Sequence, residues 1–235
     1  MDGNGRWASR RFLPRIAGHK QGVDALVRCV RACGKRQSKV LTVFAFSSEN
    51  WNRPKEEVSD LVELLAMSLA RQITGLKTNG VQLNFIGNRQ LLSAKVHQAL
   101  EHGETTTSAY QGLVSNVCFN YGGRWDIAQA ARPRAERDET ITKLALDRCM
   151  ALSHVADPDV LIRTGGEFRT SNFLLWQSAS TELHFSALLW SEFGEQALND
   201  ALHAFQKRGR RFGQTTVQLS ELVLTRASRA VTRAA

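Results

Sequence analysis

The chain has 235 residues, of which 43% are hydrophobic and 23% are charged. This composition excludes a largely disordered chain and fits one sizeable α/β domain, or at most two small ones. The 31 basic residues exceed the 22 acidic ones by nine, which favours an anionic partner such as a nucleic acid, a phosphorylated small molecule or an anionic membrane surface.

Helical and strand patterns alternate along the chain, as in βαβ units around a mainly parallel sheet. The predicted helices are 19–36, Pro54 to beyond Leu69, 91–107, 125–131, 141–150 and 194–208, and the predicted strands are 40–46, 81–86, 113–119 and 160–162. The charged segment 132–139 contains Pro133 and is predicted to be a surface loop. No internal repeat and no sharp domain boundary are visible.

The four cysteines are Cys29, Cys33, Cys118 and Cys149. Their spacing does not indicate a zinc site, and we expect reduced, mostly buried thiols in a cytoplasmic protein. The sequence contains no signal peptide and no apolar run of about 18 residues, so we expect any membrane contact to be peripheral.

The first polar segment is MDGNGRWA, at residues 1–8. The glycines on either side of Asn4 allow a tight turn whose N–H groups approach an anion, and Arg6 adds a positive charge. Asp2 would repel a phosphate unless a cation lay between them, and Mg²⁺ usually binds one or two carboxylates together with phosphate oxygens. A plain surface turn is the alternative, whereas a Walker loop is excluded because its lysine pattern is absent.

Two further polar segments follow predicted strands, at the edge where open α/β sheets bind ligands. Residues 46–54 offer hydrogen-bonding side chains and Arg53. The alternative is a helix N-cap region with Asn52 as the cap and Pro54 just inside the helix, and both interpretations can hold together. Residues 159–172 carry a double glycine between Arg163 and Arg169. Guanidinium groups match phosphate oxygens, so this segment suits a second diphosphate, with a solvated basic loop as the alternative.

Several strings in the chain resemble the signature segments of the cis-prenyltransferases, the family of bacterial undecaprenyl diphosphate synthase, and they occur in the family's order. These strings are MDGNGRWA, GHK, FAFSSENWNRP, NYGGRWDI, LIRTGGE, SNFLLWQ and RRFG. The resemblance extends from Met1 to about Gln214. It implies a prenyltransferase domain over residues 1–214 and a C-terminal tail over residues 215–235.

The resemblance implies a single α/β domain with a central, mostly parallel sheet, flanking helices and an apolar tunnel, usually as a homodimer. The implied reaction joins an allylic diphosphate, typically farnesyl diphosphate, to successive isopentenyl diphosphates. Each new double bond is cis, and the product is a long carrier lipid for cell-wall glycans. The expected location is the cytoplasm, with peripheral contact at the inner face of the membrane for product release.

The resemblance also assigns roles to individual residues. Asp2 is expected to position Mg²⁺ and assist diphosphate departure, Asn50 to help remove a proton, and Glu182 to bind metal together with Asp2. The residues expected to bind substrates are Gly3, Asn4, Gly5, Arg6, Trp7, Arg15, His19, Ser47, Ser48, Glu49, Trp51, Arg53, Arg163, Arg169, Thr170, Ser171, Arg211 and Gly213. The expected tunnel residues are Leu61, Leu65, Leu69, Leu83, Phe85 and Leu113, the last of them near the floor.

Two features depart from the family pattern. Family members usually carry an apolar strand before MDGNG, so either the recorded start is late or this strand is missing. If it is missing, Asp2 is expected on an unanchored end. Phe168 stands where the bacterial enzymes commonly have a histidine near the metal, so Asp2 and Glu182 would have to suffice as ligands. A non-catalytic subunit of the same fold and a nucleic-acid-binding protein are the alternative functions. The scattering of Lys and Arg along the chain argues against nucleic acid.

Overall fold

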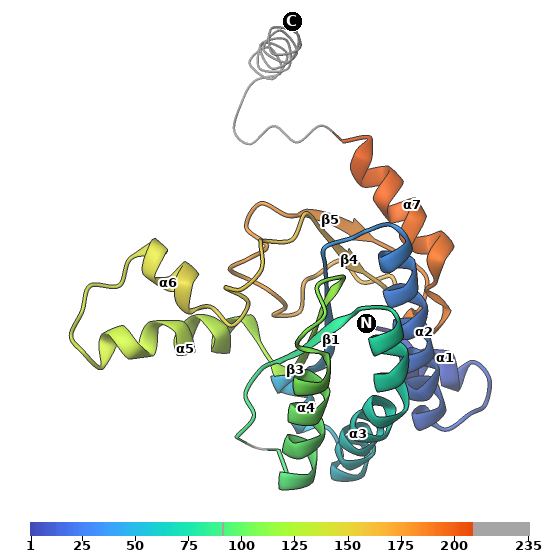
Figure 1. Ribbon diagram of the computed structural model, residues 1–235. Coiled ribbons are helices and arrows are strands. Elements are labelled where there is room, and N and C mark those ends of the chain that lie inside the picture. Colours follow the sequence, from blue (N-terminus) through green and yellow to red (C-terminus); the bar gives the residue numbers. More distant parts are fainter. Residues whose placement is uncertain (91, 209–235) are drawn as a thin grey trace, which may run out of the picture. The chain divides into compact units, whose positions relative to one another are not determined.

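The computed structural model describes residues 1–90 and 92–208 (Figure 1). Met1–Ala201 form one compact unit and Leu202–Ala235 a second, of which residues 202–208 are described. The predicted tail at 215–235 and the substrate-binding residues Arg211 and Gly213 lie outside the described residues.

The described chain alternates helices and strands in the order that the α/β prediction requires. The elements are α1 (Asn4–Ser9), α2 (Arg15–Lys35), β1 (Val40–Ser47), the 3₁₀ helix η1 (Ser48–Asn52), α3 (Lys55–Thr78), β2 (Gln82–Ile86), α4 (Ala94–Thr107), β3 (Val114–Tyr121), α5 (Gly123–Ala135), α6 (Lys143–Cys149), β4 (Val160–Arg163), β5 (Glu182–Phe185), the 3₁₀ helix η2 (Trp190–Glu192) and α7 (Glu195–Gln206).

The five strands pair in parallel, which confirms the predicted fold class. They form two sheets among the described residues, one of order β1-β3-β2 and one of β4 with β5. The central strand β3 is buried over nearly its whole length. Such double-sided burial explains why this strand shows as a continuous apolar run in the sequence.

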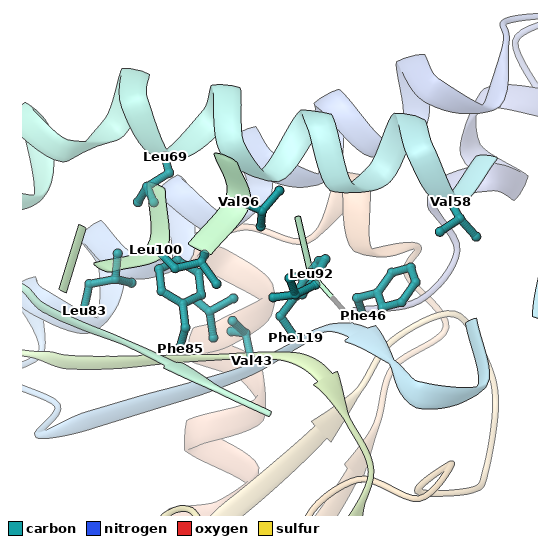
Figure 2. Close-up of a cluster of buried hydrophobic side chains, with 11 residues drawn as sticks. Val43, Phe46, Val58, Leu69, Leu83, Phe85, Leu92, Val96, Leu100 and Phe119 are labelled. Carbon is teal, nitrogen blue, oxygen red and sulfur yellow. The ribbon is translucent and has the colours of Figure 1, made fainter. Parts of the chain in front are cut away.

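Alternation along β3 divides its side chains between two faces of the sheet. Val117 and Phe119 belong to a cluster that α3 and α4 cover, and Figure 2 shows Val58 and Leu69 of α3 pointing toward the strand residues of this cluster. Cys118 belongs to a second cluster, with residues that follow α6 and with residues 173 and 174. Each large apolar side chain that is buried in this way contributes about 1.5–3 kcal/mol.

Several predicted element boundaries are wrong. Helix α1 is not among the predicted helices, and α4 begins at Ala94 rather than at residue 91. Helix α5 continues through Pro133 to Ala135, so the first half of the predicted loop at 132–139 is helical. The proline lies in the last turn, and the helical bonds continue past it, because the N–H of Glu136 donates to the carbonyl of Arg132 at 2.9 Å.

Cys29, Cys33 and Cys118 are buried, as predicted, while Cys149 is exposed. Within residues 1–90 and 92–208, no helix combines the length and the apolar character that crossing a bilayer requires.

Candidate active site

Asp2 is fixed by hydrogen bonds to both of its backbone polar groups. Its N–H donates to Oγ1 of Thr164 at 3.0 Å, and its carbonyl oxygen accepts from the N–H of Trp190 at 2.8 Å. The Thr164 hydroxyl also donates to this carbonyl oxygen, at 3.2 Å. The expectation of an unanchored Asp2 is therefore wrong, because the loop after β4 and the start of η2 hold it in place.

Gly3 starts helix α1 in a conformation that favours glycine. Its φ of 100° lies in the left-handed region, and a Cβ at this position would lie 2.6 Å from Cδ2 of Leu189. Asn4 is already helical, so the expected glycine-flanked open turn is reduced to the turn at Gly3. This turn lets the N–H of Gly3 donate to Oδ1 of Asp2 at 2.6 Å, which orients the carboxylate.

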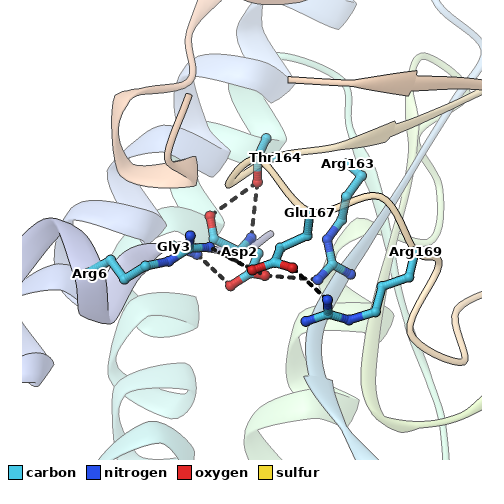
Figure 3. A network of polar contacts seen from close by, with 7 residues as sticks. All are labelled: Asp2, Gly3, Arg6, Arg163, Thr164, Glu167 and Arg169. Atoms are coloured by element: carbon cyan, nitrogen blue, oxygen red, sulfur yellow. Dashed lines mark hydrogen bonds and ion pairs between the residues drawn. The ribbon is translucent and has the colours of Figure 1, made fainter. Parts of the chain in front are cut away.

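Three arginines and two carboxylates form the polar network at the centre of the site (Figure 3). Nη2 of Arg163 donates to Oδ2 of Asp2 at 2.8 Å, and Nη2 of Arg6 lies 3.7 Å from the same oxygen. Arg6 also lies 3.8 Å from Oε1 of Glu167, while Arg169 pairs with the other oxygen of Glu167. Both predicted diphosphate segments thus meet in one network, which has one positive charge in excess.

Glu167 is a member of this network that the sequence analysis did not single out. The signal available was its place in LIRTGGE, two residues before Arg169. The first glycine ahead of it has a steric purpose, because a Cβ on Gly165 would lie 2.6 Å from Nη2 of Arg6. Gly165 therefore lets the Arg6 guanidinium approach the loop that carries Arg163 and Arg169.

A second network gathers around Glu57, near the start of α3. Oε1 of Glu57 accepts from Arg15 at 3.1 Å and from Arg53 at 3.0 Å, and it lies 3.9 Å from Nε2 of His19. Partial burial raises the pKa of this carboxyl, but the hydrogen bonds and charges of Arg15 and Arg53 outweigh burial and hold the pKa below its usual value. Glu57 therefore orders three residues that were predicted to bind substrate, and the sequence analysis treated it only as a helix-start residue.

Two nitrogens in these networks have unmet hydrogen-bonding capacity. Nε2 of His19 and Nε of Arg163 are buried and lack a hydrogen-bond partner among the described residues. An unsatisfied buried polar group costs about 1–3 kcal/mol, so such groups usually indicate a ligand or a water molecule. Both nitrogens belong to residues that the sequence analysis predicted to bind a diphosphate.

Burial also determines the charge of His19. The imidazole side chain is 13% exposed. Burial lowers its pKa from the usual 6.5, Glu57 opposes this shift, and Arg53 and Arg15 reinforce it. The imidazole is therefore neutral at pH 7 and can donate one hydrogen bond or accept one.

We expect His19→Gln to reduce the loss of stability in mild acid. The pKa of His19 is lower in the folded state than in the unfolded state, so its contribution is fully present above about pH 6.5 and is lost as the pH falls through the folded-state value. Urea unfolding at pH 7.5 and pH 5.5 should show a smaller difference in the free energy of unfolding for the variant than for the unmodified chain. Equal differences in the two proteins would mean that His19 does not titrate in this window.

The segment after β1 is held by its own polar side chains. Oδ1 of Asn50 accepts from the N–H of Ser47 at 3.0 Å, which closes the turn into η1. Glu49 accepts from Asn172 at 2.7 Å and is thereby tied to the loop that follows Arg169. The predicted cap at Asn52 is wrong, because Asn52 ends η1 and α3 begins at Lys55 after Pro54 without a side-chain cap, whereas Ser47 and Asn50 cap η1. The side-chain N–H₂ of Asn50 is the group left for a substrate role.

Glu182 and Phe168 are placed by strand β5. Glu182 pairs with Val160 at the start of the β4–β5 ladder, whereas Arg163 lies at its end, about 10 Å away at 3.3 Å per residue. Phe168 is 79% exposed and its ring packs on Phe185, with the ring centroids 5.2 Å apart. No group of three or more His, Cys, Asp or Glu side chains that could hold a metal occurs in the described residues. The pairing of Asp2 with Glu182 at one metal ion stays a prediction.

An apolar cavity of about 170 Å³ lies between α2, α3 and the three-stranded sheet. Met1 and Asn4, the residues on either side of Asp2 and Gly3, contribute to its lining. Along α2 the lining extends from His19 to Arg31, which is about 18 Å at 1.5 Å per residue. The cavity therefore begins beside the polar networks and is long enough for a chain-like ligand.

Most of the predicted tunnel residues contribute to this lining. They are Leu61, Leu65, Leu69, Leu83 and Phe85. Leu113 is buried, but it is not part of the lining. The sequence analysis missed the contribution of α2, whose Val23, Leu26, Val27 and Val30 line the opposite wall, because their helical spacing fits any buried helix face.

Comparisons with known proteins agree with this geometry. Residues 1–213 match the protein family described as "Putative undecaprenyl diphosphate synthase". The chain is 49% identical over 220 residues to an isoprenyl transferase of Neisseria meningitidis serogroup B, covering 93% of this chain and 89% of that protein. It is 46% identical over 226 residues to the ditrans,polycis-undecaprenyl-diphosphate synthase of Pseudomonas putida, described as (2E,6E)-farnesyl-diphosphate specific, covering 93% of this chain and 90% of that protein.

A solved structure shares the fold. It is lavandulyl diphosphate synthase from Lavandula x intermedia, in complex with dimethylallyl diphosphate. The TM-score is 0.87 at 32% sequence identity, and the match covers 91% of this chain and 95% of that chain.

Proposed function

The chain belongs to the undecaprenyl diphosphate synthase family of prenyltransferases, and we propose that it condenses farnesyl diphosphate with successive isopentenyl diphosphates. The product proposed is a long cis-polyprenyl diphosphate, undecaprenyl diphosphate. The relative from Pseudomonas putida, whose name specifies farnesyl diphosphate, supports the choice of the allylic substrate.

The observation that carries this proposal is the arginine network at the mouth of an apolar cavity. Arg6, Arg163 and Arg169 gather around Asp2 and Glu167, and the residues next to Asp2 and Gly3 line the cavity. A prenyl diphosphate combines a dense negative charge with an apolar chain, so it needs these two environments side by side.

In the proposed reaction the allylic C–O bond breaks, a new C–C bond joins the two prenyl units, and isopentenyl diphosphate loses one proton. Arg6 stabilises the negative charge that develops on the departing allylic diphosphate, and Arg163 and Arg169 hold isopentenyl diphosphate. Fixing both diphosphates brings the reacting carbons together, an effect worth up to roughly 7–11 kcal/mol in ideal cases. We assign this proton to an oxygen of the departing diphosphate, with the side-chain N–H₂ of Asn50, whose Oδ1 is already bonded to Ser47, helping to position that acceptor.

Magnesium is the cofactor that we propose, and the donor set of the site fits it. Asp2 offers a carboxylate that is 39% exposed, and Mg²⁺ usually binds through one or two carboxylates plus phosphate oxygens rather than in an all-protein cage. When bound, the ion supplies positive charge against the departing diphosphate. Asp2 would hold it, and Arg163 and Gly3 fix the two oxygens of this carboxylate.

The cavity receives the growing chain and keeps water from it. Leu and Val side chains of α2 and α3 supply its walls, and each CH₂ that they bury contributes about 0.8 kcal/mol. Because the cavity follows α2 away from His19, each added unit would push the older end of the chain toward Arg31 and Leu76.

We expect Ser115→Phe to shorten the product. Ser115 is 1% exposed, lines the cavity and pairs with Leu83, near the amino ends of the strands and so away from the polar networks. A ring at this position fills the space that later units would occupy, whereas the first condensation should keep a near-normal rate. Chromatographic sizing of the product tests this, with the exposed Ser108→Phe as a control that keeps the normal chain length. An unchanged length distribution in Ser115→Phe would mean that the chain grows elsewhere.

We further propose that the protein is a cytoplasmic homodimer. It would contact the inner face of the membrane peripherally. Leu175, Leu183 and Leu188 are each about 40% exposed and suit a partner surface. The apolar product gives a reason for the membrane contact.

The experiment that tests the function uses the purified chain with farnesyl diphosphate, labelled isopentenyl diphosphate and Mg²⁺, followed by sizing of the extracted product. A long cis-polyprenyl diphosphate is expected, and its formation should stop when EDTA removes the metal. The alternative of a non-catalytic subunit predicts no product, and the ordered Asp2 and Arg163 argue against it.

A further inference from the structure

The loop between α1 and α2 exposes two apolar side chains that the active site does not explain. Phe12 is 99% exposed and Leu13 is 43% exposed, and the preceding Arg10 and Arg11 are exposed as well. In Figure 1 this blue loop projects from the edge of the compact unit, next to α1 and the start of α2. An exposed phenylalanine ring has no favourable contact in water.

The backbone conformation of Phe12 adds strain to the unfavourable exposure of its ring. Phe12 has a φ of 56°, in the left-handed region where a bulky residue is rare and strained. The turn is nevertheless well defined, because the N–H groups of Phe12 and Leu13 donate to Ser9 and Ala8 at 3.2 Å and 3.0 Å. The chain therefore holds a strained, exposed aromatic residue in one place, and contacts within the described residues do not compensate for it.

The surroundings of Phe12 combine aromatic and basic groups. The Arg11 guanidinium lies 4.4 Å from the centre of the Trp7 ring and 3.2 Å from Glu192, which hold it beside the loop. Arg10 lies next to it and is exposed. Aromatic rings next to arginines suit the boundary between lipid headgroups and acyl chains, and anionic headgroups attract the basic residues.

We propose that the Arg10–Leu13 loop docks the enzyme on an anionic bilayer, with Phe12 and Leu13 entering the headgroup region and Arg10 and Arg11 facing the lipid phosphates. The net charge of +9 has the sign that this surface requires. The loop leads directly into α2, which lines the cavity from His19 onward. Docking here would bring the substrate end of the cavity near the membrane that receives the product, a point that rests on the proposed function.

Sedimentation of the full chain with vesicles tests the proposal. We expect binding to vesicles of phosphatidylglycerol and phosphatidylcholine, and much weaker binding to phosphatidylcholine alone. Phe12→Gly should weaken binding to the anionic vesicles about tenfold, through the lost apolar contact. The same variant should melt about 2–4 °C higher, because glycine adopts a positive φ without strain. A gain in stability together with a loss of binding cannot come from misfolding.

The controls separate this inference from the proposed function. Leu144→Ser removes another exposed apolar side chain, on α6, and should leave vesicle binding unchanged. Turnover of Phe12→Gly in detergent should equal that of the unmodified chain, so the docking idea can fail while the enzyme activity stands. Binding that is unchanged in Phe12→Gly, or equal on both kinds of vesicle, would overturn the proposal. A dimer that dissociates in Phe12→Gly while vesicle binding persists would instead assign the loop to a contact between two copies.

Discussion

Asp2→Ala should lower turnover about a thousandfold while the fold stays intact. The carboxylate is the group that we assign to hold the metal against the departing diphosphate, and such electrostatic stabilisation is worth several kcal/mol, at 1.36 kcal/mol per tenfold change in rate. The variant also loses the hydrogen bonds from Gly3 and Arg163. Turnover under saturating substrate and Mg²⁺ is the measurement.

Stability should change little, because backbone groups anchor this segment. The bonds to Thr164 and Trp190 use the N–H and C=O of residue 2, which alanine retains. The matched variant is Asp2→Asn, which keeps the shape and one of the two acceptor oxygens but lacks the charge. We expect Asp2→Asn to be nearly as inactive as Asp2→Ala. Its melting temperature should be close to that of the unmodified chain. Near-normal turnover in Asp2→Asn would remove metal binding from the role of Asp2.

The parts of the fold that the sequence predicts well are those with one strong periodic signal. The segment 113–119 reads as a buried strand because both faces of β3 are covered, so its apolar residues run without a break. Helix α1 has only six residues and lies between glycine and a strained turn, so it carries no periodic signal. At Pro133 the usual incompatibility of proline with a helix interior predicts a helix end, but α5 continues through this residue for its last turn.

The residues of the candidate site likewise divide into those that the sequence predicts and those that it does not. The arginines of the diphosphate segments were predictable because their charge is informative wherever the chain folds. Glu57 and Glu167 were not, because their importance comes from the partners that the fold places beside them. An acidic residue among predicted phosphate ligands looks unfavourable in sequence, yet in the structure it orders the arginines.

Arg163→Ala should raise the KM for isopentenyl diphosphate by about 10–100-fold, and more than it raises the KM for the allylic substrate. The side chain is 13% exposed, and its buried Nε lacks a hydrogen-bond partner among the described residues. Each hydrogen bond to a charged group is worth about 1.5–3 kcal/mol, so losing one such contact accounts for the expected change. Arg169 is 64% exposed, and Arg169→Ala should raise the same KM less. Equal effects on both substrates would contradict the assignment of Arg163 to the isopentenyl diphosphate site.

Arg163 also donates to Asp2, so its removal should lower turnover as well, and a double-mutant cycle separates the two effects. If Arg163 acts on turnover by orienting the Asp2 carboxylate, then Arg163→Ala should cost little further turnover in an Asp2→Asn background. Its effect on the KM for isopentenyl diphosphate should persist there, because that contact does not involve Asp2. Arg163→Lys retains the charge without the planar fork of donors and should recover only part of the KM. Additive losses of turnover in the double variant would show that Arg163 stabilises the departing diphosphate by itself.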